Sequence, residues 1–147
     1  MAATEAHTIK VTIEGQDELT LVYELNDKRE IVSAKLSVIG CPEMMELVKK
    51  WRPLLKGSVD AIPLPKETHH SAILLRQLVL ELQGKWDFPY KDYELCHCRA
   101  IPTKKVDDAI ICGAKTVRDV SRKTSAGTAC GTCRPDIEKV LKYRQGA

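Results

Sequence analysis

Four of the six cysteines lie in two close pairs, and these pairs constrain the fold of the region around them more than any other feature. The first pair is Cys96 and Cys98, and the second is Cys130 and Cys133. Thiolates this close in sequence can bind metal from a single loop. If both pairs bind together, residues 99–129 fold back so that two loops form one four-thiolate site.

The spacing of the pairs discriminates between metals. Structural zinc sites mostly use pairs with about two to four intervening residues, whereas His97 alone separates the first pair here. In a [2Fe-2S] cluster each iron takes two thiolates, so one short pair per iron is a natural division. The spacing therefore favours a [2Fe-2S] cluster, with zinc as the main alternative and a redox or incidental arrangement as the third.

The residues around the cysteines carry a family resemblance. They comprise Cys96-His97-Cys98-Arg99, Ile101-Pro102, Gly113, Thr116-Val117-Arg118-Asp119-Val120 and residues 124–133. In this order and spacing, residues 94–143 resemble the bacterioferritin-associated ferredoxin-like [2Fe-2S] domain. The resemblance implies a [2Fe-2S] cofactor, with the four motif cysteines as its ligands: Cys96, Cys98, Cys130 and Cys133.

Short helices are predicted on both sides of the cysteine pairs. Thr116 followed by Asp119 resembles a capping box, with Asp in place of Glu, and predicts a helix start. Apolar residues at helical spacing predict a helix over 103–111. Pro135 suits the first turn of a helix that runs to about Tyr143. We therefore expect a small all-helical domain at residues 91–147.

Three other residues of this domain carry weaker expectations. Gly127 and Gly131 would let the backbone pass close to sulfur and present N–H groups to it, or they would serve ordinary turns. Cys112 is expected to be a buried helix residue rather than a ligand.

The amino-terminal part predicts a sheet followed by helices. Apolar and polar residues alternate over 9–13, 19–25 and 30–39, which is typical of half-buried strands. Helical spacing then extends over 44–51, with Pro53 as a break, and over 71–83. The predicted fold is α+β, in which a three-stranded antiparallel sheet with covering helices at residues 1–90 precedes the all-helical [2Fe-2S] domain.

Residues 14–83 also resemble, more faintly, the U-type iron-sulfur cluster assembly scaffold, as in the amino-terminal domain of NifU-like proteins. The matching pieces are Asp17, Ile39-Gly40-Cys41, Leu64-Pro65 and His69-His70-Ser71-Ala72-Ile73-Leu74. The scaffold's assembly site has three cysteines, an aspartate and a histidine. Asp17, Cys41 and His69 match one residue of each kind, whereas Gly15 and His70 stand where the other two cysteines belong.

This second resemblance raises a second candidate metal site. Asp17, Cys41, His69 and His70 offer a carboxylate, a thiolate and imidazoles, a set able to hold zinc or iron. The alternative is structural: a turn cap, a small buried cysteine and a polar helix start.

Charge is distributed unevenly. Residues 91–147 carry twelve Lys and Arg and seven Asp and Glu, a balance of +5, whereas residues 1–90 have a balance of −2. A basic cluster domain could steer a redox or iron-sulfur assembly partner with an acidic surface, although a solvated surface of mixed charge is the alternative. Sparse aromatic residues and the lack of a recognition motif argue against nucleic acid.

These observations predict a [2Fe-2S]-binding protein that acts in electron transfer or in iron-sulfur cluster or iron handling. The alternative is an interaction module that zinc or an inert cluster holds folded. We do not expect an enzyme, because no nucleophile-base pair or phosphate loop stands out. Six cysteines with no apolar leader predict a cytoplasmic location, and no apolar stretch is long enough to anchor the chain in a membrane.

Overall fold

The computed structural model of the chain describes residues 6–13, 17–67, 69–128 and 131–145. The chain divides into two units: the first comprises residues 1–67 and 71–86 and holds a sheet with two helices, and the second comprises residues 68–70 and 87–147 and holds three further helices. Helices and sheet together give an α+β fold, as predicted. Among the described helices, none is long and apolar enough to cross a bilayer.

The sheet of the first unit is antiparallel throughout. Its strands, in spatial order, are β1 (Ala6–Ile13), β2 (Asp17–Leu25), β3 (Glu30–Ile39) and β4 (Gly57–Ser58). Leu21 is fully buried and pairs with Leu36 of β3, so the alternating apolar residues face one core. The three predicted strands are confirmed. The fourth, β4, was missed because two residues are too few to show alternation.

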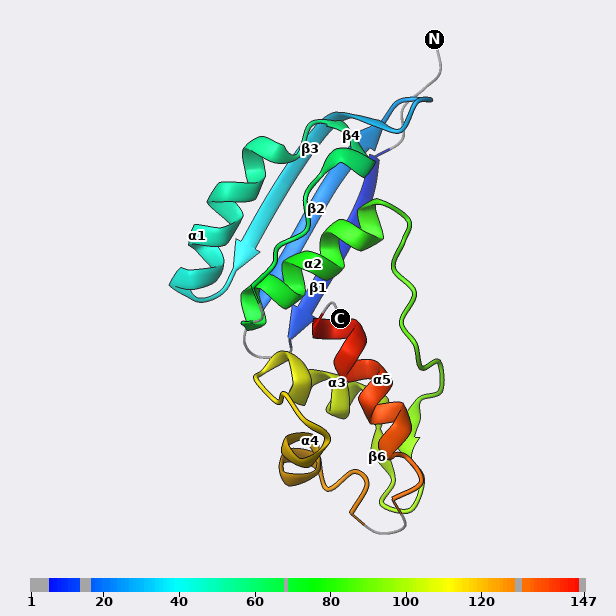
Figure 1. The fold of residues 1–147 in the computed structure, drawn as a ribbon. Coiled ribbons are helices and arrows are strands. Elements are labelled where there is room, and N and C mark those ends of the chain that lie inside the picture. Colours follow the sequence, from blue (N-terminus) through cyan, green and yellow to red (C-terminus); the bar gives the residue numbers. More distant parts are fainter. Residues whose placement is uncertain (1–5, 14–16, 68, 129–130, 146–147) are drawn as a thin grey trace. The chain divides into compact units, whose positions relative to one another are not determined.

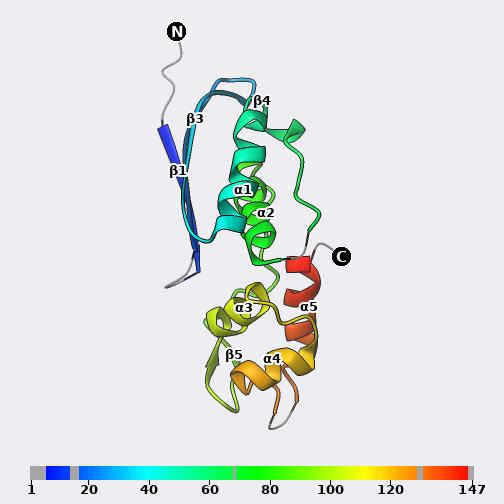
Figure 2. The same ribbon diagram turned by 90° about the vertical axis from the view of Figure 1, so that its left-hand side faces the viewer.

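Two helices cover one face of this sheet (Figure 2). They are α1 (Pro42–Trp51) and α2 (His70–Leu82), and two short 3-10 helices, η1 (Arg52–Leu54) and η2 (Val59–Ala61), lie between them in the chain. Buried residues of α1 are Met44, Leu47 and Val48. Nine residues of α2 are buried, so that helix is enclosed on most sides, as its nearly continuous apolar sequence requires.

Strand pairing fixes which loops meet at one end of the sheet. Glu18 near the start of β2 pairs with Ile39 at the end of β3. Because the two strands are antiparallel, Asp17 therefore lies beside the residues that follow β3, Gly40 and Cys41.

The second unit contains a two-stranded ribbon and three helices (Figure 1). Its elements are β5 (Glu94–Cys96), β6 (Ile101–Pro102), α3 (Thr103–Ile111), α4 (Val117–Thr124) and α5 (Arg134–Gln145). The helices agree with the predicted ones, and the unit is mainly helical as expected, with the short β5–β6 ribbon in addition. Glu94 pairs with Pro102 and Cys96 with Ile101, so the segment around the first cysteine pair is a hairpin.

The start of α4 has the predicted cap. Thr116 Oγ1 accepts a hydrogen bond from the Asp119 N–H at 3.1 Å, and Asp119 Oδ2 accepts one from the Lys115 N–H at 3.2 Å. The hydrogen bond from Lys115 is the main cause that lowers the pKa of Asp119 below 3.8. The helix ends at Ser125, which adopts a left-handed conformation with φ of 69°. That turn starts the loop toward the second cysteine pair.

A buried ion pair joins α3 to α5. The Arg144 guanidinium donates to both carboxylate oxygens of Asp107, at 2.7 and 2.6 Å. Arg144 also lies over the Phe88 ring, with its guanidinium carbon 5.8 Å from the ring centroid. The side chains of Arg144 and Asp107 are 4% and 16% exposed, so this bidentate pair is part of the core of the second unit.

Candidate metal centre

Three of the four predicted cluster ligands lie in the described part of the chain. Cys96 is the last residue of β5 and is 2% exposed, and Cys133 directly precedes α5 and is 6% exposed. Cys98 lies in the β5–β6 turn and is exposed. The fourth predicted ligand, Cys130, lies outside the described residues.

These three cysteines line one small cavity of about 70 Å³. The other lining residues are Tyr90, Leu95, His97, Thr132 and Asp136. The hairpin turn thus brings Cys96 and Cys98 to the same cavity as Cys133, although α3 and α4 separate them in the chain. Folding back over residues 99–129 is what a shared site for both pairs requires.

The thiol of Cys96 is the best defined of the three. Its burial, the largest single influence, raises its pKa, but hydrogen bonds together outweigh this and lower the pKa below 9.0. They come from the backbone N–H groups of Gly127, Arg99 and Cys98 and from the side chain of Cys133. These contacts stabilise a thiolate, the form in which cysteine binds metal.

The loop before the second pair depends on a glycine. Gly127 has a φ of 75°, in the left-handed region that glycine adopts without strain. Its N–H group donates to Cys96, which is the first of the two roles considered for this glycine, and its carbonyl oxygen accepts a hydrogen bond from Arg134 Nε at 3.2 Å. Gly127 therefore links the first cysteine pair to the residue that follows the last cysteine.

Sequence reasoning missed several residues around the cavity. Burial, followed by the carboxylates of Asp92 and Asp136, raises the pKa of Tyr90, whose hydroxyl group donates to the Glu94 carbonyl oxygen at 3.1 Å. The only sequence indication that Asp136 lies near the cavity is its position three residues, or about one helical turn, after Cys133. Tyr90 precedes the motif and had no sequence signal.

Two neighbouring residues bind no metal in this arrangement. His97 points to solvent, with a side chain 69% exposed and Nδ1 3.0 Å from Glu94 Oε1. Cys112 was expected to be buried but is exposed, because it follows the last residue of α3 as the C-cap. It is not among the residues that line the cavity.

The donor set fits a sulfur-ligated centre. Thiols from two separate loops face one cavity, and backbone N–H groups point at a buried sulfur, as they do around iron-sulfur clusters. Among the described cysteines, none forms a disulfide.

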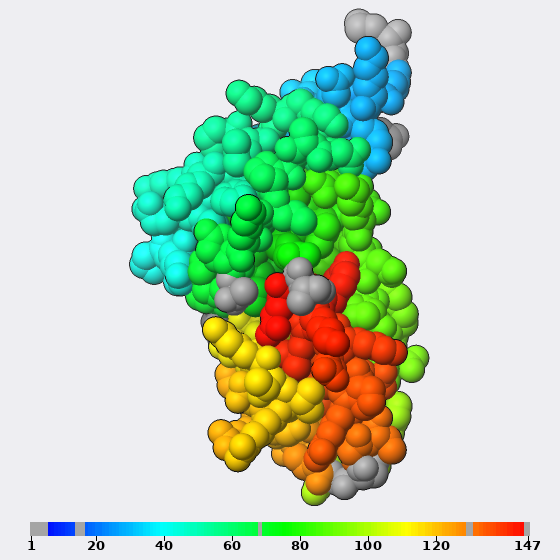
Figure 3. Space-filling model, in the orientation of Figure 1, coloured from blue at the N-terminus to red at the C-terminus, as the bar shows by residue number. Residues whose placement is uncertain are grey.

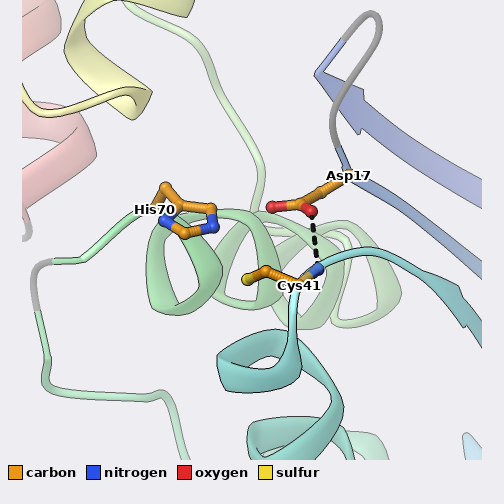
Figure 4. A group of neighbouring side chains, drawn as sticks. All are labelled: Asp17, Cys41 and His70. Carbon is orange, nitrogen blue, oxygen red and sulfur yellow. Dashed lines mark hydrogen bonds between the residues drawn. The ribbon is translucent and has the colours of Figure 1, made fainter.

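A second group of possible ligands comprises one residue at the start of β2, one after β3 and one at the start of α2. One ligand atom from each of Asp17, Cys41 and His70 can be chosen so that all three lie within 4.8 Å of one another (Figure 4). His69, the fourth residue predicted for this site, is not part of the group. The two histidine rings are 6.5 Å apart and nearly perpendicular.

Comparison with known families identifies the segment around the cysteine pairs. Residues 95–143 match the BFD-like [2Fe-2S] binding domain. The comparisons with curated proteins and with solved structures found no match. The matched segment contains both cysteine pairs, and its cofactor is a [2Fe-2S] cluster. The resemblance of residues 14–83 to the U-type scaffold stays a prediction.

Proposed function

We propose that this protein holds a [2Fe-2S] cluster through Cys96, Cys98, Cys130 and Cys133 and acts in electron transfer or in iron-sulfur cluster or iron handling. One observation carries the proposal: cysteines from both pairs line a single cavity inside the segment that matches a [2Fe-2S]-binding domain. It is an accessory protein rather than an enzyme. A cofactor that thiolates hold suits a reducing compartment such as the cytoplasm, as do six cysteines in the chain.

The exposure of the cysteines supports this role. When bound, a [2Fe-2S] cluster supplies one-electron chemistry. Cys96 and Cys133 lie in the core and limit the access of water to one side of the site, whereas Cys98 is exposed on the hairpin turn. An exposed ligand leaves little protein between the site and a docked partner. The side that carries Cys98 is therefore the proposed side for exchange.

A groove between α4 and α5 supports an acidic protein as the partner. It has a volume of about 600 Å³, and its lining residues are Val117, Arg118, Ser121, Arg134, Pro135 and Glu138. The two helices form adjoining parts of the surface in Figure 3. With two arginines against one glutamate, and a balance of +5 over residues 91–147, the groove suits carboxylates.

Anaerobic redox titration tests the electron-transfer role. The full chain, purified without oxygen, should be reduced by dithionite and reoxidised without loss of its visible spectrum. The reduced form should give a rhombic electron paramagnetic resonance signal. A colourless protein that contains zinc at the cysteine pairs would contradict the proposal. It would favour the alternative, an interaction module that zinc holds folded. A cluster that cannot be reduced reversibly would remove the electron-transfer role.

Transfer of the cluster to an apo-ferredoxin, followed by circular dichroism in the visible range, tests cluster handling. Faster transfer than from free iron and sulfide would support that role. No transfer, together with reversible reduction, would leave electron transfer as the function.

A further inference from the structure

A short segment precedes the matched family domain and is fixed to the second unit at both ends. We call this segment, residues 87–93, the strap. At its start, the Asp87 N–H donates to the hydroxyl oxygen of Tyr143 at 2.7 Å. The Phe88 ring is perpendicular to the Tyr143 ring, with centroids 6.4 Å apart. These contacts hold the start of the strap on α5.

The first residue of α3 holds the end of the strap. Thr103 is 8% exposed, and both of its donors point to strap carbonyl groups. Its N–H donates to the carbonyl oxygen of Tyr93 at 2.7 Å, and its hydroxyl group donates to that of Asp92 at 2.6 Å. Because a buried donor that loses its partner is costly, these bonds fix the strap where it enters β5.

Tyr90, in the middle of the strap, lies at the cavity of the cysteines. Its side chain lines that cavity with Cys96 and Cys133 and packs against the buried core of the second unit. Its hydroxyl group donates to the Glu94 carbonyl oxygen at 3.1 Å, and Glu94 opens β5, the strand that ends at Cys96. The ring therefore covers part of the cavity, while the hydroxyl group holds the strand that carries a proposed ligand.

The surroundings keep the phenol of Tyr90 neutral. Burial is the largest influence that raises its pKa above 10.0. Four anionic groups raise the pKa further: Asp92, Asp136, Cys133 and Glu94. A neutral phenol keeps its proton for the hydrogen bond to β5 and adds no charge beside the thiolates.

We propose that Tyr90 is a positioning residue of the cluster site, whose ring closes one side of the cavity against water and whose hydroxyl group fixes the strand that ends at Cys96. This inference rests on the proposed function, because it needs the [2Fe-2S] cluster at the cysteines. The matched domain begins at residue 95, so the site extends to a strap that lies outside that domain.

Exclusion of water by Tyr90 has two consequences for a bound cluster. Solvent access controls the local dielectric environment of a metal centre, and through it the reduction potential. Reduction adds one negative charge to a site that already carries thiolates, and this charge is less favourable where water is excluded. Tyr90 therefore lowers the reduction potential and slows the access of chelators to the iron.

Variants at two tyrosines of the strap test the proposal in the anaerobically purified full chain. Y90A removes the ring and the hydroxyl group, whereas Y90F keeps the ring. Y93A is the matched control, because Tyr93 is 83% exposed and is not among the residues that line the cavity. An iron chelator gives the rate at which the visible spectrum is lost, and anaerobic redox titration gives the midpoint potential.

We expect both measurements to change in Y90A. Cluster loss should be about tenfold faster than in the parent, the lower end of what outer-shell changes cost a metal site. The midpoint potential should rise by about 59 mV, which is a tenfold change in the equilibrium constant of a one-electron reduction. Y90F should keep the parent's potential, because its ring still excludes water, and Y93A should match the parent in both measurements.

Folding is checked by far-UV circular dichroism. Y90L keeps an apolar side chain in the core but is smaller than the ring, and it replaces Y90A if that variant does not fold. Its cluster loss and potential should change in the same directions as those of Y90A.

The results separate this inference from the proposed function. Equal behaviour of Y90A and Y93A in a protein that holds iron and sulfide would overturn the inference and leave the proposed function intact. Faster cluster loss in Y90A with an unchanged potential would also overturn it, because Tyr90 would then support the fold without excluding water. A parent protein that holds zinc and no sulfide would contradict the proposed function, and the inference with it.

Discussion

Arg134 Nε donates to the carbonyl oxygen of Gly127 at 3.2 Å, across the loop that carries the second cysteine pair. The N–H of Gly127 in turn donates to Cys96. Arg134 directly follows Cys133, so the backbone of Gly127 and the side chain of Arg134 together tie the two cysteine loops to each other. The orientation of the ligands therefore depends on a glycine and an arginine that bind no metal themselves.

Replacement of Gly127 tests this link. G127A should lower stability by about 1–2 kcal/mol, since a left-handed φ is unfavourable with a Cβ atom, and that atom would also lie 3.2 Å from Arg134 Cγ. We expect faster loss of the visible absorbance of the cluster when iron chelator is added. G84A is the matched control, because Gly84 also has φ of 71° but lies in the first unit. Equal rates of cluster loss in the two variants would contradict the link.

Serine substitutions test which cysteines bind the cluster and which do not. C133S should lose most of the cluster, because Cys133 lines the cavity with Cys96 and Cys98. C112S should keep the parent's iron content and visible spectrum, because that thiol is exposed on the C-cap of α3. Loss of the cluster in C112S, with retention in C133S, would reverse the assignment.

The buried pair of Asp107 and Arg144 should support the second unit strongly. D107A should lower its free energy of unfolding by about 3–5 kcal/mol, because Arg144 stays buried without that carboxylate. The double variant D107L/R144M should be far less destabilised than the sum of its single changes predicts. Urea unfolding followed by near-UV circular dichroism measures both. Additive effects would show that the two side chains stabilise the unit independently.

Charge in the groove between α4 and α5 should affect reactions with anions. R118E should slow the oxidation of the reduced protein by ferricyanide, an anion, most strongly at low salt. K105E makes the same charge change at an exposed residue of α3 that does not line the groove, and should have a smaller effect. Stopped-flow kinetics at several ionic strengths measures this. Equal effects of the two variants would argue against the groove as the docking surface.

The sequence predicted most helices and strands because their periodicity is strong. Leu19 and Leu21 alternate with polar residues and lie in the sheet, and Thr116 caps α4. Shorter features had too little pattern: β4 and the β5–β6 hairpin are each built from strands of two or three residues. Pairing across the chain, rather than local preference, forms these strands.

The sequence predicted the type of each candidate site, but it did not predict every residue that lies there. Spacing alone indicated that Cys96, Cys98 and Cys133 share a site, whereas Tyr90 lies at the cavity through tertiary packing that no local pattern encodes. At the start of α2, sequence reasoning could not separate His69 from His70. Which of two adjacent histidines faces Asp17 depends on where α2 begins, and helix boundaries are the least predictable feature of a helix.

Native mass spectrometry of the anaerobically purified full chain tests the central claim most directly. It should show the chain with about two irons and two sulfides bound, and the C96S, C98S, C130S and C133S variants should each lose that added mass. The claim would be contradicted by a chain that carries zinc without sulfide at these cysteines, or by disulfides between them in material never exposed to oxygen.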